Sequence, residues 1–317
     1  MPRVSINLCC YNSERYLDET LRSLVNQTYR DWELVIIDDG STDRTDAIVR
    51  RYIAEGWPIV YHRQTNAGLA AARNEALRRS SGELIAFIDH DDLWEPRKLE
   101  CQVPLFDRNQ RIGLVYSDCL NVRDDGFAFR QYQKLRPHAG AAFGALFSHY
   151  FLSVQTVVVH RRALADAGWF DPQFQVLVDA DFFLRIAHHW ELAWVSEPLA
   201  RIRMHRHNTT HARRDRFPIE MRWLLEKQRA LHPDFDRRYA REVEEFLLQA
   251  ARTEARIAWE QDQRQRALEI IRPYRHRDRA MARDFWLVRY VPYSFYERLR
   301  LLLSQPHRLS RYLGIGS

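Results

Sequence analysis

The sequence predicts an α/β fold with a mostly parallel central sheet and flanking helices, followed by a C-terminal helical segment. Three observations indicate this fold. Strand and helix patterns alternate through the first hundred residues, which is typical of βαβ units. Two short apolar runs, 34–37 and 84–88, predict buried parallel strands, and carboxylates follow each of them. Beyond His211 the strand patterns stop, and charged and apolar residues recur at helical spacing.

The first elements follow one another in a regular order. A strand is expected where apolar residues, many of them β-branched, fill a short run, and a helix where apolar residues recur every three or four positions. The expected strands are 4–10, 32–38, 59–62, 84–88 and 113–117. The expected helices are 13–27, 42–54, 68–80 and 96–106. Ligand-binding loops should then lie at the carboxyl ends of the strands.

The later elements are less regular. The polar residues 118–137 predict a loop with edge strands at most. The expected elements after this loop are a strand at 154–160, a helix at 161–167, a turn at 168–172, a helix at 181–189 and helical spacing over 220–271. We therefore expect a domain built on the sheet at 1–210 and a helical segment at 211–317.

Composition limits the class of protein. The chain has 317 residues, 46% of them hydrophobic, but no apolar stretch of 18 residues and no signal-peptide pattern, so a cytoplasmic protein is expected. Its four cysteines show no CxxC spacing, which favours reduced core residues over disulfides or zinc. The formal charge is −4 over 1–110, +2 over 111–210 and +8 over 211–317. The basic C-terminal part suggests an anionic surface as partner.

Carboxylates crowd the ends of two predicted strands. Asp38 and Asp39 follow the first apolar run, and Asp89, Asp91 and Asp92 follow the second. Crowded carboxylates repel one another unless a cation or hydrogen-bond donors compensate them. Hard oxygen ligands suit Mg²⁺ or Mn²⁺, which in turn can hold a diphosphate. The pattern predicts a metal-bound nucleotide.

An ordered set of motifs identifies a resemblance. The strings VIIDDGSTD at 35–43, NAGLAAARN at 66–74 and FIDHDD at 87–92 each follow a predicted strand. In this order they resemble the family 2 glycosyltransferases of the nucleotide-diphospho-sugar transferase, or GT-A-like, fold. The strand that ends in YN at 11–12 and the AGWFD turn at 167–171 resemble further family motifs. The resemblance spans about residues 2 to 210 and implies that fold and activity.

The resemblance places the nucleotide base near Tyr11 and Asp39. A carboxylate can accept the imide proton of uracil or thymine, and a phenol ring offers a stacking face. A donor carrying UDP or dTDP is therefore favoured. In the alternative interpretation, Asp38, Asp39 and Ser41 form a helix N-cap cluster before Asp43.

The resemblance also implies that Gly68 and Arg73 line the nucleotide pocket and that Asp89 reaches the ribose and the outer shell of a metal ion. Gly68 at a helix start would let backbone amides approach the nucleotide. Without the family, Gly68 is a turn glycine and Arg73 a surface salt-bridge partner. Both alternatives stay open.

Asp89 and Asp91 form a DxD motif, in which Asp91 is the expected first metal ligand. The resemblance adds His205 as a ligand or diphosphate contact, and Asp92 as a support of the loop. A DDL run could instead cap the helix near Pro96, and a histidine in a basic loop is often simply solvated. The expected cofactor is Mg²⁺ or Mn²⁺.

An inverting single displacement needs a base that takes the proton of the acceptor hydroxyl. The segment VDADFFLR at 178–185 resembles the family's EDxDLxLR pattern and implies that Asp179 is this base, just before a helix. Val178 replaces the usual glutamate, which removes one carboxylate from the pair. We expect Asp181 to be the N-cap of the helix.

The basic C-terminal segment predicts an amphipathic helix. Ser294 and Glu297 have the spacing of a capping box, and Phe295, Leu299 and Leu302 share one stripe. Arginines beside such a stripe suit an anionic bilayer surface, so we expect attachment to the inner face of a membrane. The alternative is a helix packed on the catalytic domain.

We therefore expect an inverting, metal-dependent glycosyltransferase whose hydroxyl acceptor is a cell-surface glycan or lipid-linked precursor. A catalytically weak nucleotide-sugar-binding module is the alternative, because of Val178. A nucleic-acid-binding protein is less favoured, because acidic loops repel a polyphosphate backbone. A dehydrogenase is disfavoured, because the first strand leads into CCYNSERYL, which lacks the glycines of a pyrophosphate loop.

Overall fold

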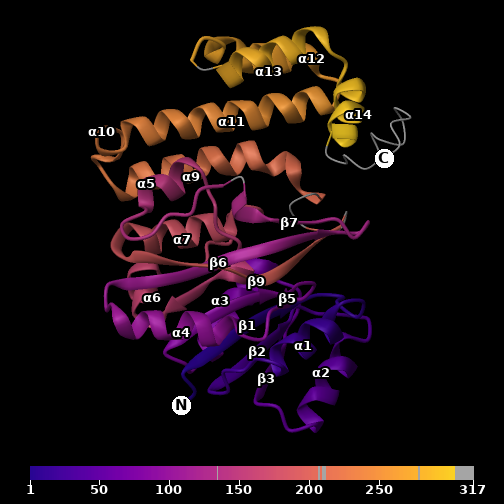
Figure 1. Ribbon diagram of the computed structural model, residues 1–317, viewed down its shortest axis with the longest axis vertical. Coiled ribbons are helices and arrows are strands. Elements are labelled where there is room, and N and C mark those ends of the chain that lie inside the picture. The colour runs from indigo at the N-terminus through magenta and orange to yellow at the C-terminus, as the bar shows by residue number, and fades with distance from the viewer. Residues whose placement is uncertain (134, 206–207, 209–211, 278, 304–317) are drawn as a thin grey trace, which may run out of the picture. The chain divides into compact units, whose positions relative to one another are not determined.

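The computed structural model describes residues 1–317 except 134, 206–207, 209–211, 278 and 304–317, and the side chains of 299–303. The chain forms two compact units, Met1–Arg213 and Arg214–Ser317 (Figure 1). Within the described part of the chain, no helix combines the length and the apolar character that a bilayer crossing requires.

Unit 1 is built on a nine-stranded sheet with the strand order β3-β2-β1-β4-β8-β6-β9-β5, and β7 pairs with β6. Its strands are β1 (Val4–Cys10), β2 (Trp32–Asp38), β3 (Ile59–Arg63), β4 (Leu84–Asp89), β5 (Leu93–Trp94), β6 (Ile112–Arg123), β7 (Ala128–Arg130), β8 (Val158–His160) and β9 (Glu191–Met204). The first four strands are parallel to one another, whereas β8 runs antiparallel between β4 and β6. The predicted fold class is confirmed, and the complete sheet is mixed.

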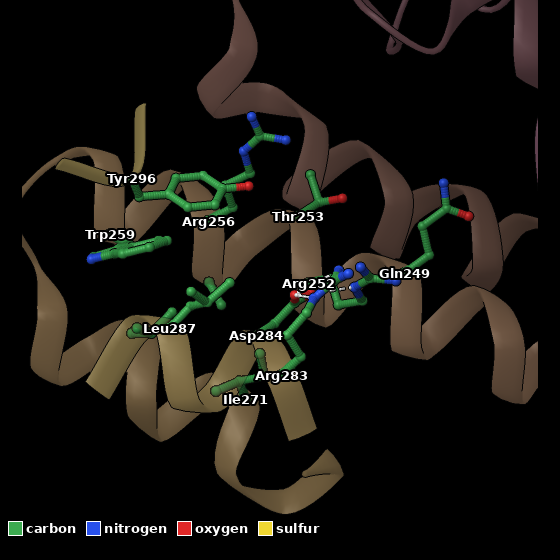
Figure 2. Close-up of a pocket in the computed structure, with 12 residues that line it drawn as sticks. Gln249, Arg252, Thr253, Arg256, Trp259, Ile271, Arg283, Asp284, Leu287 and Tyr296 are labelled. Atoms are coloured by element: carbon green, nitrogen blue, oxygen red, sulfur yellow. Dashed lines mark hydrogen bonds and ion pairs between the residues drawn. The ribbon is translucent and has the colours of Figure 1, made fainter. Parts of the chain in front are cut away.

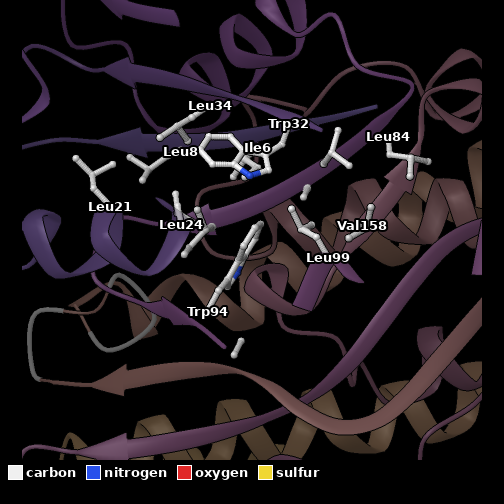
Figure 3. Packing of buried hydrophobic residues seen from close by; sticks show 14 of the residues in the cluster. Ile6, Leu8, Leu21, Leu24, Trp32, Leu34, Leu84, Trp94, Leu99 and Val158 are labelled. Atoms are coloured by element: carbon white, nitrogen blue, oxygen red, sulfur yellow. The ribbon is translucent and has the colours of Figure 1, made fainter. Parts of the chain in front are cut away.

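Helices cover both faces of this sheet. They are α1 (Leu17–Val25), α2 (Thr45–Ala54), α3 (Leu69–Arg79), α4 (Lys98–Arg108), α5 (Phe143–Ser148), α6 (Arg161–Ala167) and α7 (Val178–His189). Alternate residues of a strand point to opposite faces, so Leu34 packs in the core shared with α1 and α4, whereas Val35 packs against α3. Figure 3 shows the larger of these cores, in which Trp94 and Leu99 lie beside the first strands.

Two expectations for the middle of the chain are confirmed only in part. The loop with edge strands expected over 118–137 includes one such strand, β7, but residues 118–123 continue β6, because they pair along their length with β9, a strand of 14 residues that the sequence patterns did not indicate. Only Val158–His160 of the strand expected at 154–160 is extended. Val154–Thr156 form a 3₁₀ turn, in which the Thr156 amide donates to Ser153 and the Val157 amide to Val154.

Helix α7 begins at Val178, three residues earlier than expected. Asp179 therefore lies in the first turn of the helix and not before it. Asp181 is not the N-cap, which is Leu177, but a buried residue inside the helix. Arg185, one turn later, donates to Asp181 at 2.7 Å and compensates its charge.

Unit 2 is helical, as the spacing predicts. Its α-helices are α9 (Phe217–Leu231), α10 (Phe235–Arg238), α11 (Ala240–Glu260), α12 (Arg264–Ile271), α13 (Arg279–Tyr290) and α14 (Tyr293–Leu303). Small and aromatic side chains such as Ala258 and Trp259 form its core. Helix α14 begins at Tyr293, so Ser294 lies inside the helix and not at a cap. The side chains of Leu299 and Leu302 are outside the described residues.

Candidate active site at the carboxyl ends of the first strands

The loops that follow β1 and β2 are tied to each other. The Asn12 amide donates to Ser41 Oγ at 2.9 Å, and the Thr42 amide donates to Asn12 Oδ1 at 2.8 Å. Asn12 adopts a positive φ of 49°, which asparagine tolerates better than most residues. These bonds fix the turn and leave Tyr11 49% exposed at the strand end. The phenol ring is thus available as a stacking face.

Asp39 holds the start of α3. Its carboxylate accepts hydrogen bonds from Gln64 Nε2 and the Ala67 amide, both at 2.8 Å, and from the Gly68 amide at 2.9 Å. Gly68 has φ 86° and ψ 165°, a conformation that is essentially restricted to glycine. Gly68 is therefore required by the backbone geometry. Asp39 is largely buried and has a structural function besides any contact with a base.

Asp38 is a structural residue. It is fully buried, accepts from the Ser41 amide at 2.8 Å and from the Tyr61 hydroxyl at 2.9 Å, and lies 3.7 Å from Arg63 Nε. Burial and the neighbouring Asp38 carboxylate raise the pKa of Tyr61. The alternative of a helix cap is wrong for Asp38, because α2 begins only at Thr45 and Asp38 instead fastens the turn after β2 to β3.

The side chain of Arg73 lies between two candidate site carboxylates. It is only 4% exposed, donates to Asp89 Oδ1 at 3.1 Å and forms a close ion pair with Asp179 Oδ1. Its guanidinium carbon also lies 5.5 Å from the centre of the Phe170 ring. Burial acts to lower the pKa of Arg73, but the charges of Asp179 and Asp89 raise it above its usual value. The alternative of a surface salt bridge is thus wrong.

Asp179 is a partly buried carboxyl group, with 27% of its side chain exposed, at the first turn of α7. Burial raises its pKa, the charge of Arg73 lowers it, and Asp89 raises it, with a net increase. Among the described residues its Oδ2 has no hydrogen-bond partner, so this atom is available to a ligand. Val178, in place of the expected glutamate, is buried among apolar residues.

The DxD motif is held by partners from distant segments. Gln155 Nε2 donates to Asp89 Oδ2 at 2.8 Å. His205 Nε2 lies 2.9 Å from Asp91 Oδ2, and the ring of Tyr16 stacks on His205 with 5.3 Å between ring centres. The structure thus brings Asp91 and His205 together and keeps His205 largely buried, so the interpretation of His205 as a solvated residue is wrong.

Asp92 is buried behind the motif and supports it. It accepts from the Arg203 amide of β9 at 2.8 Å, while Arg203 Nη1 donates to the backbone oxygen of Asp91 at 2.6 Å. Burial raises the pKa of Asp92 well above its usual value, and the charges of Asp91 and Asp89 raise it further. Carboxyl groups therefore accumulate at this end of β4.

This accumulation fits a divalent cation. Within the described ranges, no three His, Cys, Asp or Glu side chains are grouped so as to hold a metal by themselves. Mg²⁺ sites commonly use one or two carboxylates and take their remaining ligands from substrate phosphates and water. Carboxylate and imidazole donors at Asp91 and His205, with Asp89 nearby, satisfy that chemistry.

Cys9, near the end of β1, marks the point where the predicted residues converge. Burial raises the pKa of Cys9 to about 12. Four site residues also act on this thiol through their charges: Arg73, Asp89, Asp39 and Asp179. These four predicted residues, which come from different segments of the chain, thus lie around one strand end.

Sequence patterns missed several residues of the site. Gln155 falls in a run that resembles a strand, and Tyr16 in a helix pattern. Tyr150 has a buried hydroxyl without a hydrogen-bond partner among the described residues, and Asp179 acts on its pKa. A buried donor without a partner beside a charged site is a candidate for contact with a ligand or an ordered water. Neither residue type nor local spacing signals such a contact.

Comparison with known proteins establishes the family. The chain matches glycosyl transferase family 2 over residues 5–165, half of its length. It belongs to this family, as the motifs predict.

Individual relatives agree with this assignment, and a solved structure agrees with the fold. TuaG of Bacillus subtilis is 42% identical over 104 residues, 32% of this chain and 41% of TuaG. The UDP-Glc:alpha-D-GlcNAc-diphosphoundecaprenol beta-1,3-glucosyltransferase WfgD of Escherichia coli is 27% identical over 63% of this chain and 89% of WfgD. The mannosyltransferase PcManGT of Pyrobaculum calidifontis, solved with GDP-Man and Mn²⁺, has a TM-score of 0.64 at 20% identity, over 95% of this chain and 85% of that one. The chain spans about half the length of TuaG and similar curated relatives.

The position of Arg73 generates a stability prediction. Arg73→Met should lower the free energy of unfolding by about 3–5 kcal/mol, because two carboxylates lose their buried counter-charge. Arg78→Met is the matched control: Arg78 lies on the same helix, is 53% exposed and pairs with Glu75, so about 1 kcal/mol or less is expected. Urea denaturation measures both, and equal losses would contradict the bridging function.

Proposed function

We propose that the chain is an inverting, metal-dependent glycosyltransferase that moves a sugar from a nucleoside diphosphate to a hydroxyl acceptor. The observation that carries the proposal is the bridge from Arg73 to Asp89 and Asp179. Through this bridge Asp179, which we propose as the base, lies near Asp89 of the DxD motif, at the strand ends where α/β sheets bind ligands. Membership in family 2 supports the same conclusion.

The nucleotide would bind over the first two strand ends. Tyr11 would stack on the base, and Asp39 would accept the imide proton with Oδ2, which has one internal donor where Oδ1 has two. Gly68 would keep the start of α3 close to the nucleotide, since no Cβ intervenes. We favour UDP or dTDP as the nucleotide, and WfgD is named for a UDP donor.

Asp91 and His205 would hold Mg²⁺ or Mn²⁺, with Asp89 as an additional contact. The bound cation would neutralise the charge that develops on the departing diphosphate. Arg203 would keep Asp91 in place through its bond to the Asp91 backbone oxygen. Gln155 and Arg73 would orient Asp89 by occupying one oxygen each.

Asp179 would take the proton of the acceptor hydroxyl as that oxygen attacks the anomeric carbon. Its pKa is raised by burial, which makes the carboxylate a better proton acceptor than an exposed one. Arg73 would keep Oδ1 fixed so that Oδ2 faces the hydroxyl. A catalytically weak binding module is the second candidate, because Val178 supplies an apolar contact where a second carboxylate is usual.

We propose a lipid-linked or surface glycan precursor as acceptor, reached from the cytoplasmic face of a membrane. WfgD is named for a diphosphoundecaprenol acceptor. Unit 2 exposes three large aromatic side chains, Trp286, Tyr290 and Phe295, at 56%, 58% and 60%. Arg289 lies over the Tyr290 ring. Exposed aromatic rings beside arginine suit an anionic bilayer surface and not a nucleic acid groove.

The first test concerns the cation. Asp91→Asn should weaken UDP binding in the presence of Mn²⁺ by about tenfold or more, because one charged ligand is lost, and should leave metal-free binding unchanged. Calorimetry measures both affinities. Asp107→Asn, an exposed carboxylate on α4, is the control. If Asp91→Asn binds UDP and Mn²⁺ like the unmodified protein, the metal site lies elsewhere.

The second test concerns the base. Asp179→Asn keeps the shape but cannot accept a proton, so hydrolysis or transfer of a UDP-sugar should slow by about 10²-fold or more while UDP affinity is retained. Asp124→Asn, in the exposed turn between β6 and β7, serves as the control. Near-normal turnover of Asp179→Asn would remove Asp179 from the mechanism. Absent turnover in the unmodified protein would favour the binding module.

The third test concerns the membrane. Replacing both Trp286 and Tyr290 by alanine should reduce sedimentation with phosphatidylglycerol liposomes at low salt by about tenfold or more, because their apolar area no longer enters the interface. Leu231→Ala removes an exposed apolar residue from α9 and should have little effect. An unmodified protein that does not sediment would exclude the proposed attachment.

A further inference from the structure

Unit 2 contains a pocket of its own, lined by helices α11, α12, α13 and α14. Its volume is about 250 Å³. Figure 2 shows that its two sides differ in chemistry: Trp259, Tyr296 and Leu287 lie on one side, and Arg252, Arg283 and Asp284 on the other. An apolar surface thus faces a charged one within a single cavity.

The charged side holds more cations than carboxylates. Asp284 accepts from Arg252 Nε at 2.8 Å and from Arg283 Nε at 3.2 Å. Arg256 also lines the pocket but has no hydrogen bond or ion pair among the described residues, and its Nε is buried. A buried guanidinium donor without an acceptor is costly, and an anion would satisfy it.

A second unsatisfied donor lines the same pocket. The indole Nε1 of Trp259 is buried and has no acceptor in the described part of the chain. The Trp259 ring packs 5.0 Å from the Tyr296 ring, measured between centres, so packing fixes its orientation. Both residues line the same cavity, so an acceptor-bearing ligand bound there would satisfy these donors.

We propose that this pocket binds the phosphate head of a lipid. The arginines match the charge and geometry of a phosphate group, and Leu287, Trp259 and Tyr296 match the first carbons of an apolar chain. The pocket holds a head group and not a whole lipid, so the chain must leave it. Helix α13, which lines the pocket through Leu287, also exposes Trp286 and Tyr290, which favours a source in a bilayer over free phosphate.

This inference extends the proposed membrane attachment and is independent of the transferase activity. Its test therefore uses a soluble probe and no liposomes. Calorimetry on the full chain compares hexyl phosphate with inorganic phosphate and with hexanol. Arg256→Ala removes the unpaired guanidinium. Arg241→Ala is the matched control, since Arg241 lies on the same helix, is 85% exposed and pairs with Glu245 outside the pocket.

Hexyl phosphate should bind about tenfold or more tightly than either phosphate or hexanol, because both sides of the pocket contribute. Arg256→Ala should weaken it about tenfold or more and Arg241→Ala less than twofold. Trp259→Phe keeps the ring but removes the donor, so a loss of about threefold is expected even if Arg256→Ala fails to fold.

Several results would overturn the proposal. Equal affinity of the protein for phosphate and hexyl phosphate would rule out a lipid as the ligand and would indicate that the pocket binds a free anion. Equal affinity of Arg256→Ala and Arg241→Ala for hexyl phosphate would place its binding outside this pocket. If the protein binds hexyl phosphate but does not sediment with liposomes, only the proposed membrane attachment through the exposed aromatic residues is contradicted. The two proposals can therefore fail separately.

Discussion

The buried guanidinium of Arg73 is the interaction on which the site of unit 1 depends. It comes from α3, while its two partners come from the end of β4 and the first turn of α7. An arginine offers planar donors in two directions, so one side chain can fix two carboxylates at once. Without it, Asp89 and Asp179 would be neighbouring negative charges in a poorly hydrated place, and one of them would take up a proton or turn outward.

The remaining loops are arranged so that Arg73 reaches this position. Asp39 fastens the start of α3 through backbone amides, which sets where the helix begins and hence where Arg73 points. Asn12 and Ser41 join the first two strand ends. Many of the polar groups in these loops are thus satisfied internally, while among the described residues the Tyr11 ring, Asp179 Oδ2 and the Tyr150 hydroxyl have no such partner. A site formed in this way needs little rearrangement to bind.

The sequence predicts the fold where local pattern and tertiary environment agree. The strands Val4–Cys10 and Trp32–Asp38 and the helix Arg161–Ala167 begin and end where their apolar patterns do. Strand β9 was missed because much of its length is only partly buried and alternates little, and its extended form depends on pairing with β6. Such pairing is a tertiary interaction that no short window contains.

The residues of the candidate site likewise fall into those that the sequence predicts and those that only the folded structure brings together. Acidic clusters after apolar runs placed Asp39, Asp89 and Asp91 at strand ends, and the resemblance to family 2 glycosyltransferases placed Asp179 near the start of a helix. The helix pattern around Arg73 is compatible with either a buried or a solvent-exposed position of this side chain, so the sequence could not decide between them. Gln155 and Tyr150 carry no local signal at all, since only the folded chain brings them to the carboxylates. The functions of Asp91 and His205 as metal ligands stay predictions.

The two adjacent cysteines of β1 provide a chemical probe of the strand end at the centre of the site. Cys9 and Cys10 are adjacent and therefore point to opposite faces of the sheet, so they cannot readily join each other, and all four cysteines are free. With a pKa of about 12, Cys9 has a thiolate fraction of roughly one in 10⁴ at pH 8. Because Cys9 is only partly buried, its low ionisation is what would slow alkylation, and a faster rate would report a change in the charge or burial at the centre of the site.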